Sequence, residues 1–361
     1  MRTLAKECFR KDWINRKSQS LHTGNTFLEK SLHAFELLGR LQEEGLDFVF
    51  KGGTSLLLRL PNPKRLSIDI DVLSQETPER LEKILGKCVS SPFTGYEEDK
   101  KRVHKQPPRR RHWNFHYDTI DPKSPKQYVI LDVLDEKVLY SDVEEVDIKT
   151  SFIETNHDIR VSVPSIDNLL ADKLTAFAPN TIGQKYDEEY PEKMVKHLFD
   201  IGELFNWADS IHTVMDVYER IAKTEIGYRE KEKKIVFNEC LDDTVETARI
   251  VSGLSIDQKF HSENSSLIRQ GIDQLRGHLM GVGFSARDAA VAAAKSAYLA
   301  TAIKNGRKRS FGDIRFDNAK VASLKGKTLN KFPELNKVLQ ASPEAFYYWQ
   351  LADEISKEVS I

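Results

Sequence analysis

The first 160 residues combine helical and strand spacings of hydrophobic side chains. Apolar residues recur at helical spacing over 26–44, and the short apolar run 46–50 is typical of a buried strand. A second helix is predicted over 77–90, with Thr77 as its N-cap and Pro78 in its first turn. Strands are predicted over 65–73, 111–118 and 127–135. This mixture predicts a small mixed sheet domain of the α+β class.

After residue 160 the hydrophobic pattern becomes almost entirely helical. The predicted helical segments are 163–177, 192–207, 210–222, 240–251, 265–280, 285–304 and 343–358. Two polar stretches, 225–235 and 304–331, are predicted to be loops. We therefore expect an N-terminal sheet domain over 1–160 and a mainly helical domain over 161–361.

The composition is that of an ordinary globular protein. Hydrophobic residues make up 40% and charged residues 30% of the chain, which excludes wholesale disorder. The formal net charge is -1, so any basic surface for nucleic acid must be local. No apolar stretch reaches the ~18–20 residues of a membrane helix, and the charged N-terminus does not resemble a signal peptide. With three widely separated cysteines, Cys8, Cys88 and Cys240, we expect a cytoplasmic protein that binds no membrane.

The segment "RLSIDIDV" brings two acidic side chains together. Its apolar residues alternate with four polar ones, which are Arg65, Ser67, Asp69 and Asp71. In a strand this alternation places both carboxylates on one face, roughly 6.5–7 Å apart. Mg²⁺ prefers such oxygen ligands, and phosphoryl transfer with two metal ions uses paired carboxylates. The alternative is a solvent-exposed edge strand whose polar face only meets water.

A double glycine precedes this segment. In "VFKGGTS" an apolar strand runs through Gly52 and Gly53 into a predicted helix start. Glycines let backbone amides approach a phosphate, and a helix N-terminus offers free N–H groups. The alternative is a plain strand-to-helix turn that needs a positive φ. Neither a Walker motif nor a GxGxxG motif is present.

Together, the two motifs resemble the DNA polymerase β-like nucleotidyltransferase superfamily. The fuller form "KGGTSLLLR…KRLSIDIDV" is similar to the AbiEii/MenT-type nucleotidyltransferase toxins of bacterial toxin–antitoxin and phage-defence systems. The resemblance implies a polymerase β-like N-terminal domain in which Asp69 and Asp71 bind metal. It also implies that the nucleoside triphosphate is held by Lys51, Gly52, Gly53, Thr54, Arg65 and Ser67.

The same resemblance nominates three residues further along the chain. A third metal-binding and catalytic carboxylate is expected on a later strand, where "VILDVLD" offers Asp132 and, as a rival, Asp135. A lysine that offsets phosphate charge is expected on the first helix of the helical domain, which nominates Lys173 in "SIDNLLADKLTAF". Asp200 in "KHLFDI" matches a further substrate-binding acid, although His197 stands where the family pattern has another acid.

A basic stretch lies between the two aspartate segments. Residues 100–111 contain no acid, and the candidate nucleic-acid contacts are Lys105, Arg109, Arg110 and Arg111. The alternative is a solvated basic hairpin or a loop that docks a partner.

The resemblance therefore implies a metal-dependent nucleotidyltransferase toxin that uses a nucleoside triphosphate and two Mg²⁺ ions. Its acceptor would be RNA, with the 3′ end of tRNA favoured, and a cognate antitoxin would restrain it. Two alternatives remain: transfer to a protein or small-molecule acceptor, and a non-catalytic nucleotide-binding regulatory module.

Overall fold

The chain forms two compact units. The computed structural model describes residues 2–101, 108–231, 233–257, 260 and 263–358. The N-terminal unit comprises Met1–Ser165 together with Gly277–Val282, and the helical unit comprises Ile166–Arg276 and Gly283–Ile361. Each unit has its own hydrophobic core. Among the described residues, no helix combines the length and the apolar character needed to cross a bilayer.

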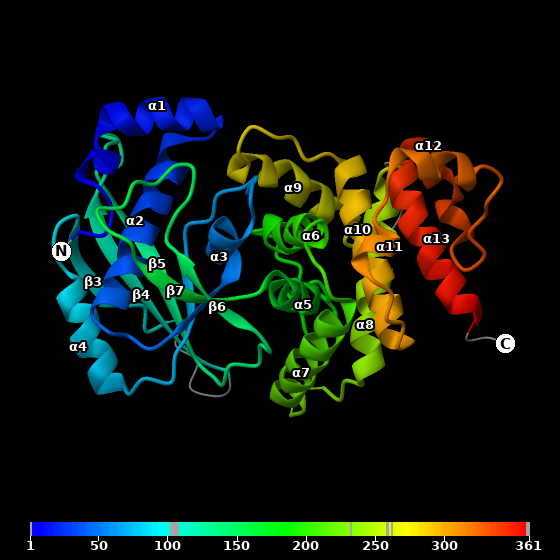
Figure 1. Cartoon of the computed structure of the whole chain (residues 1–361), viewed down its shortest axis with the longest axis horizontal. Helices are drawn as coiled ribbons and strands as arrows, with labels where there is room; N and C mark the ends of the chain where they lie inside the picture. Colours follow the sequence, from blue (N-terminus) through cyan, green and yellow to red (C-terminus); the bar gives the residue numbers. More distant parts are fainter. Residues whose placement is uncertain (1, 102–107, 232, 258–259, 261–262, 359–361) are drawn as a thin grey trace. The chain divides into compact units, whose positions relative to one another are not determined.

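The N-terminal unit is built on a five-stranded mixed sheet with the order β1-β2-β5-β4-β3 (Figure 1). Only β2 and β5 are parallel, and the other neighbours are antiparallel. The strands are β1 (Val49–Lys51), β2 (Ile70–Leu73), β3 (Phe93–Glu98), β4 (Arg109–Asp118) and β5 (Lys126–Asp135). A separate antiparallel pair contains β6 (Val143–Asp147) and β7 (Arg160–Pro164). The mixed sheet expected from the sequence is thus confirmed.

The long helix α2 (Asn25–Glu43) packs on one face of this sheet, and Figure 1 shows it crossing the strands. The aromatic side chains Trp113, Phe115 and Tyr117 alternate along β4 and are at most 1% exposed. His33 of α2 stacks on the ring of Tyr117 with centroids 3.6 Å apart. Because residues in a strand alternate between faces, the even-numbered residues of β4 project from the opposite face.

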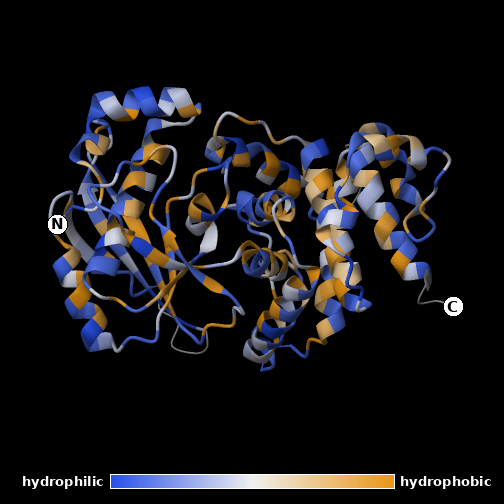
Figure 2. Cartoon of the chain, in the orientation of Figure 1, coloured by the Kyte–Doolittle hydropathy of each residue, from blue (hydrophilic) through white to orange (hydrophobic). Residues whose placement is uncertain are grey.

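The described part of this unit contains three further α-helices. They are α1 (Lys11–Leu21), α3 (Gly52–Arg59) and α4 (Pro78–Cys88). Thr77 accepts a hydrogen bond from the backbone of Arg80 at 3.3 Å, which confirms the predicted cap of α4. The helix α1 and the strands β3, β6 and β7 were not predicted from the sequence. Figure 2 shows hydrophilic and hydrophobic residues mixed along the helices.

The strand predicted over 65–73 is shorter in the structure. Only Ile70–Leu73 pair with β1 and β5. Residues 64–66 bond instead to the returning segment Gly277–Val282, through Leu66 N to His278 O and Met280 N to Lys64 O, both at 2.8 Å. Because these backbone groups have partners outside the sheet, residues 64–66 do not join the strand.

The helical unit surrounds α10 (Ala286–Lys304), which contacts α6, α8, α9 and α13. Ten of its side chains between Ala289 and Ala302 belong to small residues, which allows close helix packing. Indole Nε1 of Trp349 donates to Ser252 Oγ at 2.9 Å and joins α13 to α8. The other helices are α5 (Ile166–Ala176), α6 (Glu192–Phe205), α7 (Ile211–Arg229), α8 (Phe237–Leu254), α9 (Ser265–Leu275), α11 (Phe311–Ile314), α12 (Val338–Ala341) and α13 (Pro343–Glu358).

The predicted helices of this unit are confirmed, but two predicted loops are partly wrong. Helix α7 continues to Arg229, and the stretch 304–331 contains α11 and the short helix Asn318–Leu324. The apolar residues Phe311, Ile314 and Leu324 are at most 1% exposed and anchor these short helices in the core. Their spacing was too short to produce a clear helical period.

Candidate functional site

Four polar residues form one row across four strands of the mixed sheet. Lys51 of β1 is the register partner of Asp71 in β2, and Asp71 is the partner of Asp132 in β5. Asp132 is in turn the partner of His112 in β4. Since register partners project from the same face, the four side chains lie side by side over roughly 14 Å. This face is opposite to the one that buries the aromatic residues of β4.

The contact between His112 and Asp132 is the tightest in the row. Nδ1 of His112 hydrogen-bonds Oδ1 of Asp132. The His112 side chain is 2% exposed and that of Asp132 is 13% exposed. The imidazole therefore fixes one carboxylate oxygen of Asp132 from the neighbouring strand, while part of the carboxyl group still reaches solvent.

The glycine turn packs directly against Asp71. Gly52 has a φ of 77°, and a Cβ atom added there would lie 2.0 Å from Oδ2 of Asp71. Glycine is therefore required twice, for its backbone conformation and for the close approach of the carboxylate. Next to it, Oγ1 of Thr54 donates to the carbonyl oxygen of Asp69 at 2.5 Å, and Oγ of Ser55 donates to Gly52 O at 2.8 Å. These bonds tie the start of α3 to the aspartate segment.

Gly53 brings the two predicted triphosphate-binding side chains together. A Cβ atom added at Gly53 would lie 2.7 Å from Nη2 of Arg65 and 2.8 Å from Oγ of Ser67. Arg65 is 8% exposed, and its Nη1 also donates to the carbonyl of Leu66 at 3.2 Å. Among the residues predicted to hold the triphosphate, Gly52, Gly53, Thr54, Arg65 and Ser67 are thus clustered, and Lys51 adjoins them through Asp71.

The donor set fits a hard divalent cation in its chemistry. Asp69, Asp71 and Asp132 supply carboxylate oxygens, which Mg²⁺ prefers. Asp71 and Asp132 are register partners, and Asp69 precedes β2 by one residue. Within the described part of the chain, however, no three His, Cys, Asp or Glu side chains gather closely enough to hold a metal ion. One oxygen of Asp132 bonds His112 in this arrangement. The rival Asp135 lies at the far end of β5 and contacts Arg109 at 3.6 Å.

The helical unit joins two other predicted residues. Nζ of Lys173 on α5 lies 3.3 Å from Oδ2 of Asp200 on α6. Their side chains are 4% and 2% exposed, so the ion pair is buried within that unit. A buried charge requires such a partner, which gives both residues a structural reason to be where they are.

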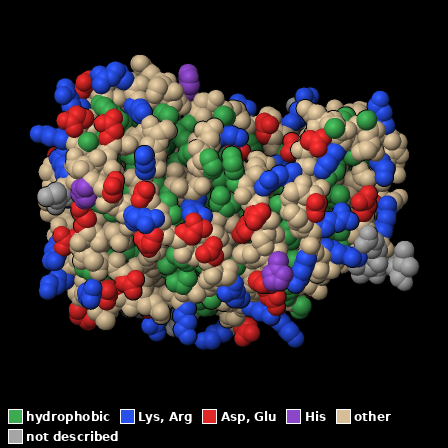
Figure 3. Space-filling view, viewed as in Figure 1, with side chains coloured by type: hydrophobic (Ala, Val, Ile, Leu, Met, Phe, Trp, Pro, Cys, Tyr) green, Lys and Arg blue, Asp and Glu red, His purple; other side chains and the backbone are tan. Residues whose placement is uncertain are grey.

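Arginines of the basic stretch have acidic partners that the sequence does not indicate. Arg109, Arg110 and Arg111 begin strand β4, and Lys105 lies outside the described residues. Arg111 pairs with Glu98 at 2.6 Å and lies over the ring of Trp113, while Arg109 contacts Asp135. Figure 3 likewise shows basic and acidic side chains interspersed on the face viewed. The local positive charge is therefore partly offset by acids that lie elsewhere in the sequence.

Two residues of this region were missed from the sequence. His112 lies on the polar side of the alternation in "RHWNFHYD", but only the register with β5 reveals its partner. Lys30 of α2 interacts electrostatically with Asp69, which partly offsets the lowering of the Lys30 pKa by burial. No spacing in the sequence links Lys30 to the aspartates.

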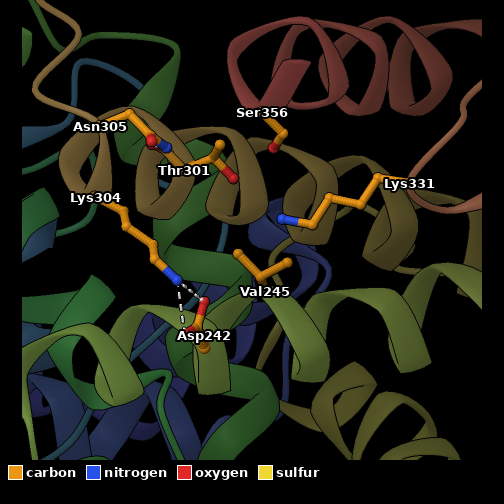
Figure 4. Close-up of a pocket in the computed structure, with 7 residues that line it drawn as sticks. All are labelled: Asp242, Val245, Thr301, Lys304, Asn305, Lys331 and Ser356. Carbon is orange, nitrogen blue, oxygen red and sulfur yellow. Dashed lines mark hydrogen bonds and ion pairs between the residues drawn. The ribbon is translucent and has the colours of Figure 1, made fainter. Parts of the chain in front are cut away.

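A cavity of about 170 Å³ lies elsewhere, within the helical unit (Figure 4). Its walls come from α8, α10, α13 and the segment before α12, and Lys304 reaches across it to Asp242. The lining residues are Asp242, Val245, Thr301, Lys304, Asn305, Lys331 and Ser356. None of the predicted site residues lines this cavity.

Comparison with known proteins identifies one family over most of the chain. Residues 36–298 match the family described as nucleotidyl transferase AbiEii toxin, type IV toxin–antitoxin system. This match covers both the glycine–aspartate segment and the helices with Lys173 and Asp200. No curated protein matches the sequence.

Two solved structures are similar to the chain. MenT4, a nucleotidyltransferase toxin from Mycobacterium tuberculosis H37Rv, covers 95% of this chain and 99% of its own length, with a TM-score of 0.53 and 12% identity. An antigenic nucleotidyltransferase-like protein from Paracoccidioides brasiliensis covers 56% of this chain and 88% of its own, with a TM-score of 0.36 and 15% identity. The match to MenT4 shows a shared fold.

Proposed function

Because the chain belongs to the AbiEii nucleotidyltransferase toxin family, we propose that it transfers a nucleoside monophosphate to the 3′ end of a tRNA. The chain is a nucleotidyltransferase, and its family uses a nucleoside triphosphate with a divalent metal ion. The observation that supports the proposal best is the row Lys51–Asp71–Asp132–His112 beside the glycine turn.

The predicted site residues would have different roles in the reaction. Asp69, Asp71 and Asp132 would hold Mg²⁺, which would neutralise phosphate charge and polarise the reacting oxygens. Arg65, Ser67 and the amides of Gly52 and Gly53 would bind the triphosphate. For Lys173 the proposal keeps the role predicted from the sequence, which is to offset phosphate charge.

The transfer itself needs one bond formed and one broken. The acceptor hydroxyl oxygen attacks the α-phosphorus in line, and the bond to the β-phosphate oxygen breaks, so pyrophosphate leaves with the electron pair. The hydroxyl proton passes to the carboxylate of Asp132. His112 engages Oδ1 of that carboxylate, so the other oxygen would take the proton.

The test is to incubate the protein with each radiolabelled nucleoside triphosphate, total RNA and lysate protein. We expect label in RNA of tRNA size. Asp69→Ala combined with Asp71→Ala should abolish labelling while leaving the thermal unfolding profile in place. Labelling that persists in the double variant contradicts the mechanism, and label in protein alone identifies a different acceptor.

The basic stretch provides a second discrimination between acceptors. Arg109→Glu with Arg110→Glu spares the Arg111–Glu98 pair. If the acceptor is RNA, this variant should be less active than the wild type at low salt, and its activity should depend less steeply on salt concentration. The matched control is Lys325→Glu with Lys327→Glu, a double charge reversal at exposed positions of the helical unit. Equal activity of the two variants would favour a small acceptor.

The family also implies a cognate antitoxin. We propose that co-expression with it restores growth of cells that make the active protein. Cells that make the Asp69→Ala, Asp71→Ala protein should need no antitoxin.

A further inference from the structure

The polar face of the sheet continues beyond Asp132 as a track two side chains wide. The register of β4 with β5 runs without interruption from Arg109–Asp135 to Asp118–Lys126. On the face of Asp132, successive register pairs are His112–Asp132, Asn114–Ile130 and His116–Tyr128. Exposure increases along the track, from the buried His112 through half-buried Asn114 and Ile130 to Tyr128, which is 41% exposed.

Tyr128 and its neighbours combine aromatic and cationic groups. The ring of His116 meets that of Tyr128 nearly edge-on, with centroids 5.9 Å apart. Nζ of Lys30 lies 5.6 Å from the centroid of the Tyr128 ring. Lys30 also interacts electrostatically with Asp69, so this one ammonium group connects the aromatic pair with the aspartate segment.

Strand β2 is shorter than its neighbour β5. The pairing of β2 with β5 stops at Ile70 and Leu131, although β5 begins at Lys126. Helix α2 packs on the other face of the sheet, and Lys30 in its second turn lies over the ring of Tyr128 and interacts electrostatically with Asp69. The start of β5 therefore presents an exposed aromatic side chain on the face of Asp132 and a cation beside it, at the part of β5 that β2 does not pair with.

We propose that Lys30, His116 and Tyr128 form a subsite for the single-stranded end of a nucleic-acid acceptor. Tyr128 packs against a base, Lys30 contacts a phosphate, and the track leads the strand toward Asp132. Tyr128 is four residues from Asp132 in a regular strand, so the subsite lies about 13 Å from the reacting end. A base stacked on an aromatic ring beside a cation is the usual way in which proteins hold single strands. The inference rests on the proposed function, since it assigns the acceptor to the same site.

Binding of an unstructured, fluorescently labelled RNA oligonucleotide with a free 3′ hydroxyl tests the subsite by anisotropy. Tyr128→Ala should weaken binding about 5- to 140-fold, the range that stacking of one base on an aromatic side chain corresponds to. Tyr128→Phe keeps the ring and should bind within about twofold of the wild type. Lys30→Met should reduce the slope of log affinity against log salt by about one.

Trp207→Ala is the matched control, because Trp207 is an aromatic residue that is 49% exposed in the helical unit. It should leave RNA binding unchanged. The subsite is overturned if Tyr128→Ala binds like the wild type, if Trp207→Ala loses as much affinity, or if the wild type binds no RNA.

Nucleoside triphosphate binding, measured on the same proteins by calorimetry, reports on the proposed function separately. A wild type that binds RNA through Tyr128 but binds no triphosphate would keep the subsite and contradict the transferase mechanism. A wild type that labels RNA of tRNA size while Tyr128→Ala retains RNA affinity would contradict the subsite alone.

Discussion

Asp71 and Asp132 are register partners on the single parallel pair of strands in the five-stranded sheet. They are 61 residues apart in the chain, yet the pairing sets their carboxylates on the same face of adjacent strands. The neighbours of the pair differ on the two sides. Asp71 packs against the backbone of Gly52, whereas Asp132 accepts a hydrogen bond from His112. Each carboxylate is therefore positioned by a different element, and each support can be removed separately.

Gly52→Ala should displace Asp71 and abolish transfer. The added Cβ would lie 2.0 Å from Oδ2 of Asp71, and alanine is strained at a φ of 77°. Gly45→Ala is the matched control, because Gly45 has a φ of 76° and open space around its Cβ position. Both variants should lose about 1 kcal/mol from backbone strain. Only Gly52→Ala should lose activity in the transfer assay. Equal activities would show that the carboxylate tolerates displacement.

His112→Leu should lower kcat about 10- to 100-fold with a smaller change in KM for the triphosphate, the range found when a residue that orients a metal-binding side chain is removed. His112→Asn can still donate a hydrogen bond to Asp132, so this variant should recover part of the lost kcat. His157→Leu is the control, because His157 pairs with Glu43 at 2.6 Å on an exposed surface. A His112→Leu enzyme with unchanged kcat would remove His112 from the site.

Lys173→Met should destabilise the helical unit by about 3–5 kcal/mol, because it removes one partner of a buried ion pair. Lys173→Met combined with Asp200→Leu should recover much of that loss in urea unfolding. Lys87→Met, which breaks the exposed pair with Glu44, should cost less than about 1 kcal/mol. If the recovered double variant also regains transfer activity, Lys173 has a structural role and does not act on the phosphates.

Glu29 should make stability fall as pH rises toward neutrality. Burial raises the pKa of Glu29 from 4.5 to about 7, so the folded state keeps a proton that the unfolded chain releases. The free energy of unfolding should therefore decrease between pH 4.5 and 7. The free energy of unfolding of Glu29→Gln should lack this decrease. Above pH 7 it should exceed that of the wild type by on the order of 3 kcal/mol. Urea unfolding at pH 5, 6, 7 and 8 measures the difference.

The nearby His33 should make stability change with pH in the opposite direction. Burial lowers its pKa to about 3, so stability is lost as pH falls below 6.5. Because His33 is present in both proteins, the difference between wild type and Glu29→Gln reports on the carboxyl group. A difference that stays constant from pH 5 to 8 would show that Glu29 is ionised in the folded protein.

Much of the sheet could be predicted because hydrophobic and polar residues alternate clearly along its strands. The aromatic side of "RHWNFHYD" and the apolar run around Asp132 indicate β4 and β5 directly. The pairing of strands could not be predicted in the same way. That β5 lies between β2 and β4 depends on contacts between distant segments, and so do the neighbours Asp71, Asp132 and His112. Local spacing contains no such information.

The same reason explains the largest error in the N-terminal unit. "RLSIDIDV" has the alternation of one long strand, but its first part pairs with backbone groups more than 200 residues later. Lys173 and Asp200 were nominated for separate roles, and only the packing of α5 on α6 shows them as an ion pair. The arginines of the basic stretch likewise meet acids from two other strands.

The return of Gly277–Val282 to the N-terminal unit has a consequence for the newly made chain. The aspartate segment leaves the ribosome early, but the backbone partners of residues 64–66 are synthesised only after some 210 further residues. At about 5–20 residues per second, this delay lasts on the order of 10–40 s. A nascent chain that stops before His278 lacks these partners, so a truncated product cannot complete the segment that contains Asp69 and Asp71.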